Sequence, residues 1–302
     1  MPWKINPPMV QARSHAAAAS QGGRIYVMGG IGESPEALAS VEIYDPKTER
    51  WSEGPALPTA RFHLTAVTLK EHIFALGGKT VEADGSIKYL KTLEILNPST
   101  QKWESGPDLL FFHAAGGGAE WRGIIYAVGG EDPEGTADRN PGTGSAERWD
   151  PLRKRWFEIA PLPAPRFGFA LVGHNNRIIV MGGKTRERGK EIFLERSDAF
   201  ETAQKSWEEY PLTRLPFPAA GLGASSMANL FIAGGESDLG VTDQIYSVDQ
   251  LQRCWIKMDP LPEPRAYCCV LTKVGHLDNS LYVIGGRDAN DRPRNTLFAF
   301  KT

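Results

Sequence analysis

The fold is decided by a stretch that reads RSHAAAAS at 13–20, RIYVMGG at 24–30 and VEIYDPKTERW at 41–51, with short connections between the three pieces. Its runs are short, rich in β-branched and aromatic residues, and bounded by Gly, Asn, Asp or Pro. Such runs are typical of antiparallel strands. Carried through its tryptophan, the stretch predicts a unit of four strands.

The same unit recurs along the whole chain. Paired glycines follow a short apolar run in each copy, and the first glycines of successive pairs lie 48, 52, 53, 52 and 51 residues apart. A period near 50 residues indicates a repeat architecture rather than two unrelated domains. The pairs are Gly29-Gly30, Gly77-Gly78, Gly129-Gly130, Gly182-Gly183, Gly234-Gly235 and Gly285-Gly286.

A tryptophan ends five of the six copies, always seven residues after an apolar residue: Trp51, Trp103, Trp156, Trp207 and Trp255. The sixth copy reaches Phe300 and the chain then ends. Trp3 stands ten residues before Arg13, as Trp51 stands ten residues before Arg61. The first residues are therefore predicted to complete the last unit.

This pattern resembles the kelch repeat, whose marks are a double glycine after an apolar strand and a tryptophan at fixed spacing. The resemblance covers the whole chain and implies an all-β, six-bladed β-propeller with four antiparallel strands per blade, the last blade closed by the N-terminal strand. We expect a single propeller over residues 1–302, with blades at about 13–60, 61–112, 113–165, 166–216, 217–264 and 265–302 plus 1–12.

Composition narrows the choice of partner. Lys and Arg number 34 and Asp and Glu number 36, so no global charge draws the chain to nucleic acid or to an anionic membrane, and we expect neither. Cys268 and Cys269 are neighbours in a strand and point to opposite faces, so they are poorly placed to form a disulfide. With no secretory signal and no apolar run that could span a bilayer, we expect a cytoplasmic protein.

One face of the propeller is predicted to carry the variation between blades. The distance from the second glycine to the tryptophan ranges from 20 to 26 residues, and this difference falls between strands two and three. In an up-and-down blade, that connection lies on the same face as the loop leading into strand one. Variable loops on a rigid scaffold are where binding residues usually lie.

We call the residue ten positions beyond each tryptophan a lead-in position. Four arginines there would give the channel mouth a positive potential and bidentate donors for carboxylates. The alternative is that these arginines are paired inside the fold and only support the loops. The six lead-in positions are Arg13, Arg61, His113, Arg166, Phe217 and Arg265.

We call the residue directly after each glycine pair a mouth position. Lys79, Lys184 and Arg287 are the cations among them, in loops that differ sharply in charge: 131–144 and 236–243 are acidic, 184–191 is basic and 287–295 is mixed. Such patterning gives orientation and selectivity. Phe112 and Phe217 are apolar anchor candidates, or else pack between blades. The mouth positions are Ile31, Lys79, Glu131, Lys184, Glu236 and Arg287.

No catalytic motif emerges from the chain. It has no GxSxG elbow, no P-loop and no HExxH motif, and we expect no metal and no cofactor. The six histidines have no cysteine or carboxylate at ligand spacing. They are His15, His63, His72, His113, His174 and His276.

The resemblance to kelch domains of BTB-kelch substrate receptors implies a non-catalytic protein-interaction module. We expect it to bind an acidic protein or peptide segment at the loop face, as the substrate-recognition part of a ubiquitin ligase or with a cytoskeletal partner. The alternative is a sugar mutarotase or epimerase. Bacterial sialic-acid mutarotases are similar kelch-like propellers, and a sugar carboxylate would suit an arginine-lined mouth.

Overall fold

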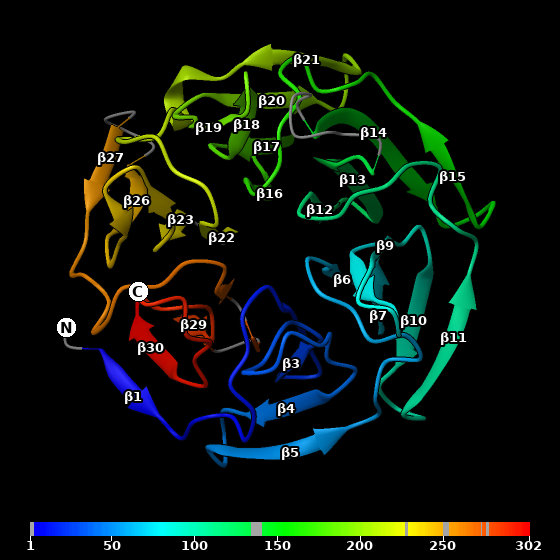
Figure 1. Ribbon diagram of the computed structural model, residues 1–302, viewed down its shortest axis with the longest axis vertical. Helices are drawn as coiled ribbons and strands as arrows, with labels where there is room; N and C mark the ends of the chain where they lie inside the picture. The colour runs from blue at the N-terminus through cyan, green and yellow to red at the C-terminus, as the bar shows by residue number, and fades with distance from the viewer. Residues whose placement is uncertain (1–2, 134–140, 227–228, 250–253, 273, 276–277) are drawn as a thin grey trace.

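The strands are arranged radially around a central axis (Figure 1). The computed structural model describes residues 3–133, 141–226, 229–249, 254–272, 274–275 and 278–302, and in these residues it contains six four-stranded antiparallel sheets. Apart from the single 3-10 turn η1 (Pro211–Thr213), this part of the chain contains no helix, and so none that is long and apolar enough to cross a membrane. The predicted six-bladed propeller is confirmed.

Each blade uses its first strand nearest the axis and its fourth strand outermost. Blades 1 to 3 consist of β2 (Ala17–Gln21), β3 (Arg24–Met28), β4 (Val41–Asp45) and β5 (Arg50–Gly54); β6 (Thr65–Leu69), β7 (His72–Leu76), β10 (Leu93–Asn97) and β11 (Lys102–Gly106); β12 (Gly117–Trp121), β13 (Ile124–Glu131), β14 (Gly142–Asp150) and β15 (Arg155–Glu158).

The other three blades follow the same order, except that the last takes its outer strand from the N-terminus. Blades 4 to 6 consist of β16 (Ala170–His174), β17 (Arg177–Met181), β20 (Ser197–Glu201) and β21 (Ser206–Glu209); β22 (Gly223–Ser226), β23 (Leu230–Ala233), β26 (Ile245–Asp249) and β27 (Cys254–Lys257); β28 (Cys269–Leu271), β29 (Ser280–Ile284), β30 (Leu297–Lys301) and β1 (Lys4–Asn6).

The constant seven-residue spacing before each tryptophan has a simple cause in strand register. Tyr44 lies directly opposite Trp51 across strands three and four, and the four equivalent pairs occur in blades 2 to 5. Directly opposed side chains on one face of a sheet contact each other. The two rings of the first pair have their centres 5.0 Å apart.

Each tryptophan also joins its blade to the preceding one. The indole Nε1 of Trp51 donates to the Pro7 carbonyl at 2.7 Å, and that of Trp103 donates to the Pro55 carbonyl at 2.9 Å. Trp3 donates in the same way to the Asp259 carbonyl at 3.3 Å. Its ring lies 5.2 Å from that of Phe300, so Trp3 occupies the place of the missing sixth tryptophan.

The N-terminal strand closes the ring of blades. β1 pairs antiparallel with β30, and the N- and C-termini lie on the same side of the molecule (Figure 1). The predicted closure by residues from the beginning of the chain is therefore confirmed.

The glycine pairs are required where one blade touches the next. Gly29 and Gly30 both have positive φ, +64° and +99°, which side chains rarely adopt. A Cβ atom on Gly29 would lie 2.5 Å from the Arg61 carbonyl oxygen of the next blade. The Gly30 N–H donates to that same carbonyl at 2.9 Å.

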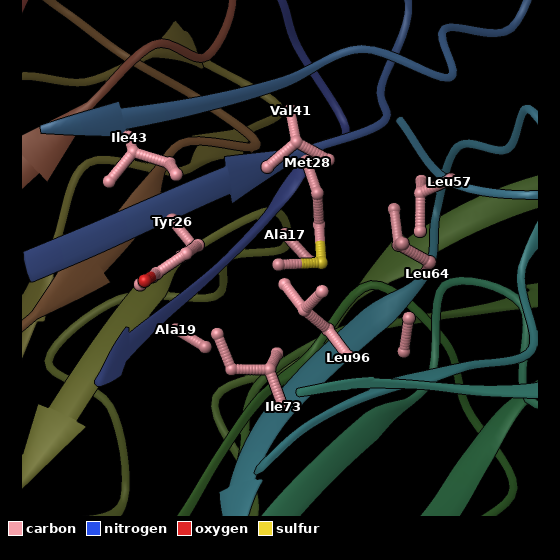
Figure 2. Close-up of a cluster of buried hydrophobic side chains, with 11 residues drawn as sticks. Ala17, Ala19, Tyr26, Met28, Val41, Ile43, Leu57, Leu64, Ile73 and Leu96 are labelled. Atoms are coloured by element: carbon pink, nitrogen blue, oxygen red, sulfur yellow. The ribbon is translucent and has the colours of Figure 1, made fainter. Parts of the chain in front are cut away.

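The hydrophobic core lies between the blades. Figure 2 shows one such cluster, in which Tyr26 and Met28 of blade 1 face Ile73 and Leu96 of blade 2. Small residues of the innermost strand, such as Ala17, complete it. The first strands of neighbouring blades contact one another around the axis, which explains their small side chains.

Strands two and three are connected differently from blade to blade, as the spacing predicts. Blades 2, 4 and 5 extend this connection as two-stranded hairpins. Residues 134–140, part of the acidic loop predicted in blade 3, lie outside the described residues. The hairpins are β8 (Lys79–Val81) with β9 (Ile87–Tyr89), β18 (Lys184–Glu187) with β19 (Lys190–Phe193), and β24 (Glu236–Ser237) with β25 (Gly240–Val241).

Candidate functional site

The lead-in arginines lie inside the blades. Arg13, Arg61, Arg166 and Arg265 have no solvent-exposed surface. Two of them hold the turn of the glycine pair in their own blade: Arg13 Nη1 donates to the Gly29 carbonyl at 3.0 Å, and Arg61 Nη1 donates to the Gly77 carbonyl at 3.0 Å. These contacts connect the first strand of a blade to the end of its second strand.

Each of three arginines also meets a carboxylate on the third strand of its own blade. The N–O distances are 2.8 Å for Arg13–Glu42, 2.6 Å for Arg61–Glu94 and 2.6 Å for Arg166–Asp198. In blade 6 the carboxylate comes from Glu263 instead, and Arg265 also donates to Thr296 Oγ1 at 3.0 Å. Burial lowers the pKa of Arg13, Arg61 and Arg166, and the paired carboxylates oppose that effect.

The two lead-in positions that are not arginine are also paired with a residue on the third strand of their own blade. His113 places Nδ1 2.7 Å from the Gly129 carbonyl and Nε2 3.0 Å from Glu147, so both ring nitrogens face acceptor oxygens. Phe217 packs on Tyr246, with the ring centres 6.0 Å apart. By strand register, Tyr246 lies where the other blades carry the paired carboxylate. A polar pair is thus replaced by an aromatic pair as a unit.

The expectation that the lead-in arginines receive an acidic segment directly needs correction. A guanidinium with no exposed surface, already paired with a carboxylate, cannot contact a partner unless the blade opens. His113 is likewise buried, at 3% exposure, and Phe217 is half-buried against blade 5. The alternative considered from the sequence, that these side chains support the loops from inside, describes their geometry.

The mouth positions, in contrast, surround an open cavity of about 600 Å³ at the end of the central channel. In blades 1 to 4 and 6, the residue after the lead-in position forms a β-bridge with the mouth residue of its own blade, as Phe62 does with Lys79. In blade 5 the bridge to Glu236 is formed by Ala220, three residues after the lead-in position. This pairing places all six mouth residues around the axis. Three predicted site residues, Lys79, Lys184 and Arg287, line the cavity.

The charges around the cavity alternate from blade 2 to blade 6. Lys79 pairs with Glu131, and Arg287 pairs with Glu236. Lys184 Nζ lies 3.4 Å from Glu236 and 2.8 Å from Glu191. Each cation also lies near an aromatic ring; the Lys79 ammonium, for example, is 5.0 Å from the centre of the Tyr89 ring. Blade 1 interrupts the alternation with Ile31.

Phe112 lies beside the mouth positions rather than among them. Its ring is half-buried, packs edge-on against Tyr89 at 6.1 Å between centres, and carries the Lys91 ammonium 4.6 Å from its own centre. Phe112 therefore supports a wall of the cavity from behind. Neither Phe112 nor Phe217 lines the cavity.

Beneath the mouth, the backbone forms a ring that the sequence pattern did not predict. Two residues after each lead-in position in blades 1 to 4 and 6, and at Gly221 in blade 5, the chain has positive φ of 51° to 65°. Each of these residues donates its N–H to the carbonyl of the previous one, at 2.7 to 3.3 Å, until the ring closes. These ring positions are His15, His63, Ala115, Gly168, Gly221 and Tyr267.

The side chains at three ring positions contact one another through their aromatic rings. The His15 ring centre lies 4.3 Å from that of His63 and 4.2 Å from that of Tyr267. Burial, with Arg287 and other nearby cations, lowers the pKa of His15 to about 3, and burial lowers that of His63 well below its usual value. Burial and the neighbouring Glu236 raise the pKa of Tyr267. Near neutral pH all three rings are therefore uncharged.

The hairpin of blade 4 carries Glu191 at the cavity, and neighbouring cations shift the pKa of this carboxyl group. Burial alone raises the pKa of Glu191, but hydrogen bonds from Lys184 and Arg186 outweigh it and the net pKa is lowered. Glu191 therefore stays ionised and holds both cations at the cavity.

Histidines, cysteines and carboxylates are the side chains that most often hold a metal ion in proteins. Within the described ranges, no group of three or more of these residues has a geometry that would hold a metal ion. His276, one of the predicted non-ligands, lies outside those ranges. Cys268 and Cys269 are buried free thiols, and burial raises their pKa to about 11 and about 12.

Comparison with known proteins gives a consistent set of relatives. The family described as Kelch motif matches residues 12–58, 60–110 and 117–163. Kelch-like protein 34 of Homo sapiens is 28% identical over 221 residues, which cover 73% of this chain and 33% of that protein. Kelch-like protein 23 of Homo sapiens is 27% identical over 268 residues, covering 87% of this chain and 43% of that protein.

A further relative and a solved structure extend the comparison. Beta-scruin of Limulus polyphemus is 25% identical over 274 residues, covering 83% of this chain and 28% of that protein. The chain thus spans less than half the length of these curated relatives. The solved structure of YjhT superimposes with a TM-score of 0.77 at 17% identity, covering 97% of this chain and 96% of the other, which shows a shared fold.

Proposed function

Because the chain belongs to the kelch-repeat family of β-propellers, we propose that it is a recognition module that binds a protein or peptide segment at the channel mouth. Kelch-like relatives suggest a protein-interaction propeller in general. The observation that carries the proposal for this site is the open cavity of about 600 Å³ surrounded by partly exposed charged side chains. Its loops differ from blade to blade on an otherwise regular scaffold, as suits selective binding.

The segment we propose is acidic, with Lys79, Lys184 and Arg287 as its contacts. The side chains of these residues keep 12%, 12% and 20% of their surface exposed. An ammonium carries three N–H donors, so Lys79, paired with one carboxylate, and Lys184, paired with two, each keep a donor for a further carboxylate. Glu131 and Glu236 separate the three cations around the mouth, which favours a segment whose carboxylates reach the cations one at a time.

The cellular role that we propose rests on the relatives more than on the geometry of the site. We propose that the chain serves as the substrate-recognition part of a ubiquitin ligase and works in the cytoplasm; a cytoskeletal partner is the other expectation. Co-purification of a cullin–RING complex tests the first role, and co-sedimentation with actin filaments tests the second. The activities of the full-length relatives are proposals for this chain, because the chain spans less than half of their length.

The sugar mutarotase alternative is not favoured by the site. That reading would be favoured by a carboxyl group beside a lead-in arginine that is poised for proton transfer. Glu263 lies beside Arg265, but hydrogen bonding from Arg265 lowers the pKa of that carboxyl, which keeps it ionised. A general acid needs the opposite shift.

The direct test is affinity capture from cell lysate followed by mass spectrometry. The native chain is compared with the Lys79→Gln/Lys184→Gln double variant, because these substitutions remove mouth charges without touching the buried lead-in pairs. A specific protein captured by the native chain and lost from the folded variant is the expected result. A set of captured proteins that does not change between the two would contradict the assignment of the mouth as the binding site.

A further inference from the structure

The backbone ring beneath the mouth is regular, but its side chains are not. Three consecutive blades, 6, 1 and 2, place aromatic rings on it: Tyr267, His15 and His63. The other three place Ala115, Gly168 and Gly221 there. All six positions have left-handed φ, so the backbone would accept a larger residue in blades 3 and 4 as it does in blades 1 and 2.

The Tyr267 ring reaches over Gly221, where an added Cβ atom would lie 2.9 Å from it, so the open half of the ring is the part over Ala115 and Gly168. His15, His63, Ala115 and Tyr267 line the cavity of about 600 Å³ above, and all six ring residues line a second cavity of about 120 Å³ below. Apolar groups such as Leu64, Phe169 and Leu222 line the lower one.

The open half lies next to the two mouth lysines. Lys184 bridges Phe167, the residue directly before Gly168. Lys79 reaches across from blade 2 to Glu131, the mouth residue of blade 3, which is also the blade of Ala115. On the filled side, the uncharged rings of His63 and Tyr267 form a wall that adds no positive charge of its own.

We propose that one acidic side chain of the bound segment inserts into this open half of the ring, over Ala115 and Gly168. Its carboxylate then lies between the ammonium groups of Lys79 and Lys184, while its methylenes rest against the His63 and Tyr267 rings, which meet edge to face. This inference rests on the proposed function and deepens it: the ring decides where the segment is anchored. The lysines decide what kind of side chain anchors it.

Filling the open half of the ring should prevent the acidic side chain from inserting, without disturbing the mouth residues. Gly168→Asn is the chosen variant because asparagine tolerates left-handed φ, and a Cβ atom there would meet no heavy atom closer than 3.6 Å. Ala115→His is the second variant, since it repeats in blade 3 the residue that blades 1 and 2 carry. His63→Ala makes the opposite change and widens the opening.

Gly22→Asn is the matched control. Gly22 also has left-handed φ, at +61°, and a Cβ atom there has no neighbour within 4 Å. It lies in the hairpin between β2 and β3, at the far end of blade 1 from the mouth. The control therefore makes the same substitution at a similar backbone angle, away from the cavity.

The probe is a fluorescein-labelled octaglutamate peptide, with binding followed by fluorescence polarisation at low salt and folding checked by circular dichroism. We expect Gly168→Asn and Ala115→His to weaken binding at least about tenfold and Gly22→Asn to leave it unchanged. His63→Ala should weaken binding by less than the two filling variants, because it removes one of the rings against which the methylenes rest but blocks nothing. The tenfold loss corresponds to about 1.4 kcal/mol.

Three results would overturn the inference. Unchanged affinity in a folded Gly168→Asn or Ala115→His chain would show that nothing inserts at the ring. If Lys79→Gln/Lys184→Gln weakens binding but the ring variants do not, the mouth still binds acidic segments and only the insertion is wrong. If octaglutamate does not bind the native chain, the acidic segment and its insertion both fail.

Discussion

Two sets of cations lie on the same face of this propeller, and they differ in depth. The lead-in arginines have no exposed surface and meet carboxylates inside their own blades. The mouth cations keep part of their surface in the open cavity and pair across neighbouring blades. The first set joins strands within a blade, and the second borders the space where a partner can reach.

The comparison teaches that charge on a binding face does not by itself identify a binding residue. Removing one partner of a buried pair leaves an uncompensated charge and is strongly destabilising. Removing one partner of a pair that borders an open cavity should cost less, because water from the cavity can solvate the charge that is left. The two sets should therefore separate cleanly when stability and binding are measured on the same variants.

The largest expected effect is on stability at a lead-in position. Arg61→Leu strands Glu94, which is 4% exposed, and should lower the free energy of unfolding by about 3–5 kcal/mol. Urea denaturation measures this, with Lys79→Gln as the matched mouth variant, whose loss should be smaller because its pair borders the open cavity. Equal losses in the two variants would break the distinction between the two sets.

The next effect is a pH dependence from the ring. His15 and His63 have depressed pKa values in the folded state, about 3 for His15, against about 6.5 when unfolded. Only the unfolded chain gains these protons as pH falls below about 6.5, so stability is full above that pH and is lost towards acid, by up to about 1.4 kcal/mol per pH unit for each histidine.

Urea denaturation between pH 7 and pH 5 measures this slope above the range in which carboxylates titrate. The His15→Asn/His63→Asn double variant should flatten it, since asparagine tolerates the left-handed backbone and does not titrate. His174, whose pKa burial also lowers, leaves a residual slope. An unchanged slope in the double variant would argue against uncharged imidazoles at the ring.

A smaller effect tests whether the lead-in pair behaves as a unit. In blade 5 the pair is Phe217 and Tyr246, whereas blades 1, 2 and 4 carry arginine with a carboxylate. Phe217→Arg alone should destabilise the chain, and adding Tyr246→Glu should restore part of the loss. A double-mutant cycle should give a coupling of about 1–3 kcal/mol, and independent, additive effects would refute the pairing.

The smallest effect is a salt dependence confined to the mouth. The stability cost of Lys79→Gln should fall as NaCl is raised to 0.5 M, because its pair borders the open cavity, where ions can screen it. The cost of Arg61→Leu should stay nearly constant. A cost at Arg61 that falls with salt as steeply as that at Lys79 would show that its pair is solvated.

The fold was predictable because its signals are local and repeated. The glycine pairs and the spacing to Trp51 and its equivalents give both the number of blades and their register, and the position of Trp3 gives the closure. These features depend on backbone geometry and strand pairing, which recur in every copy. Repetition therefore makes each weak signal strong.

The site was less predictable because accessibility depends on partners distant in sequence. Arg61 and Glu94 meet only when strand three is placed beside the lead-in loop. A signal for this existed: an acidic residue stands nine positions before the tryptophan in blades 1 to 4, and it is absent in blade 5, where the lead-in residue is Phe217. The ring was missed because left-handed backbone at His15, His63 and Tyr267 leaves no compositional mark.

The most direct test of the central claim is the affinity of one captured partner for two folded proteins, the native chain and the Lys79→Gln/Lys184→Gln variant. If the mouth positions form the binding site, the variant should bind at least about tenfold more weakly while its free energy of unfolding changes little. Equal affinity for the two proteins would place the binding site elsewhere on the propeller and contradict the account.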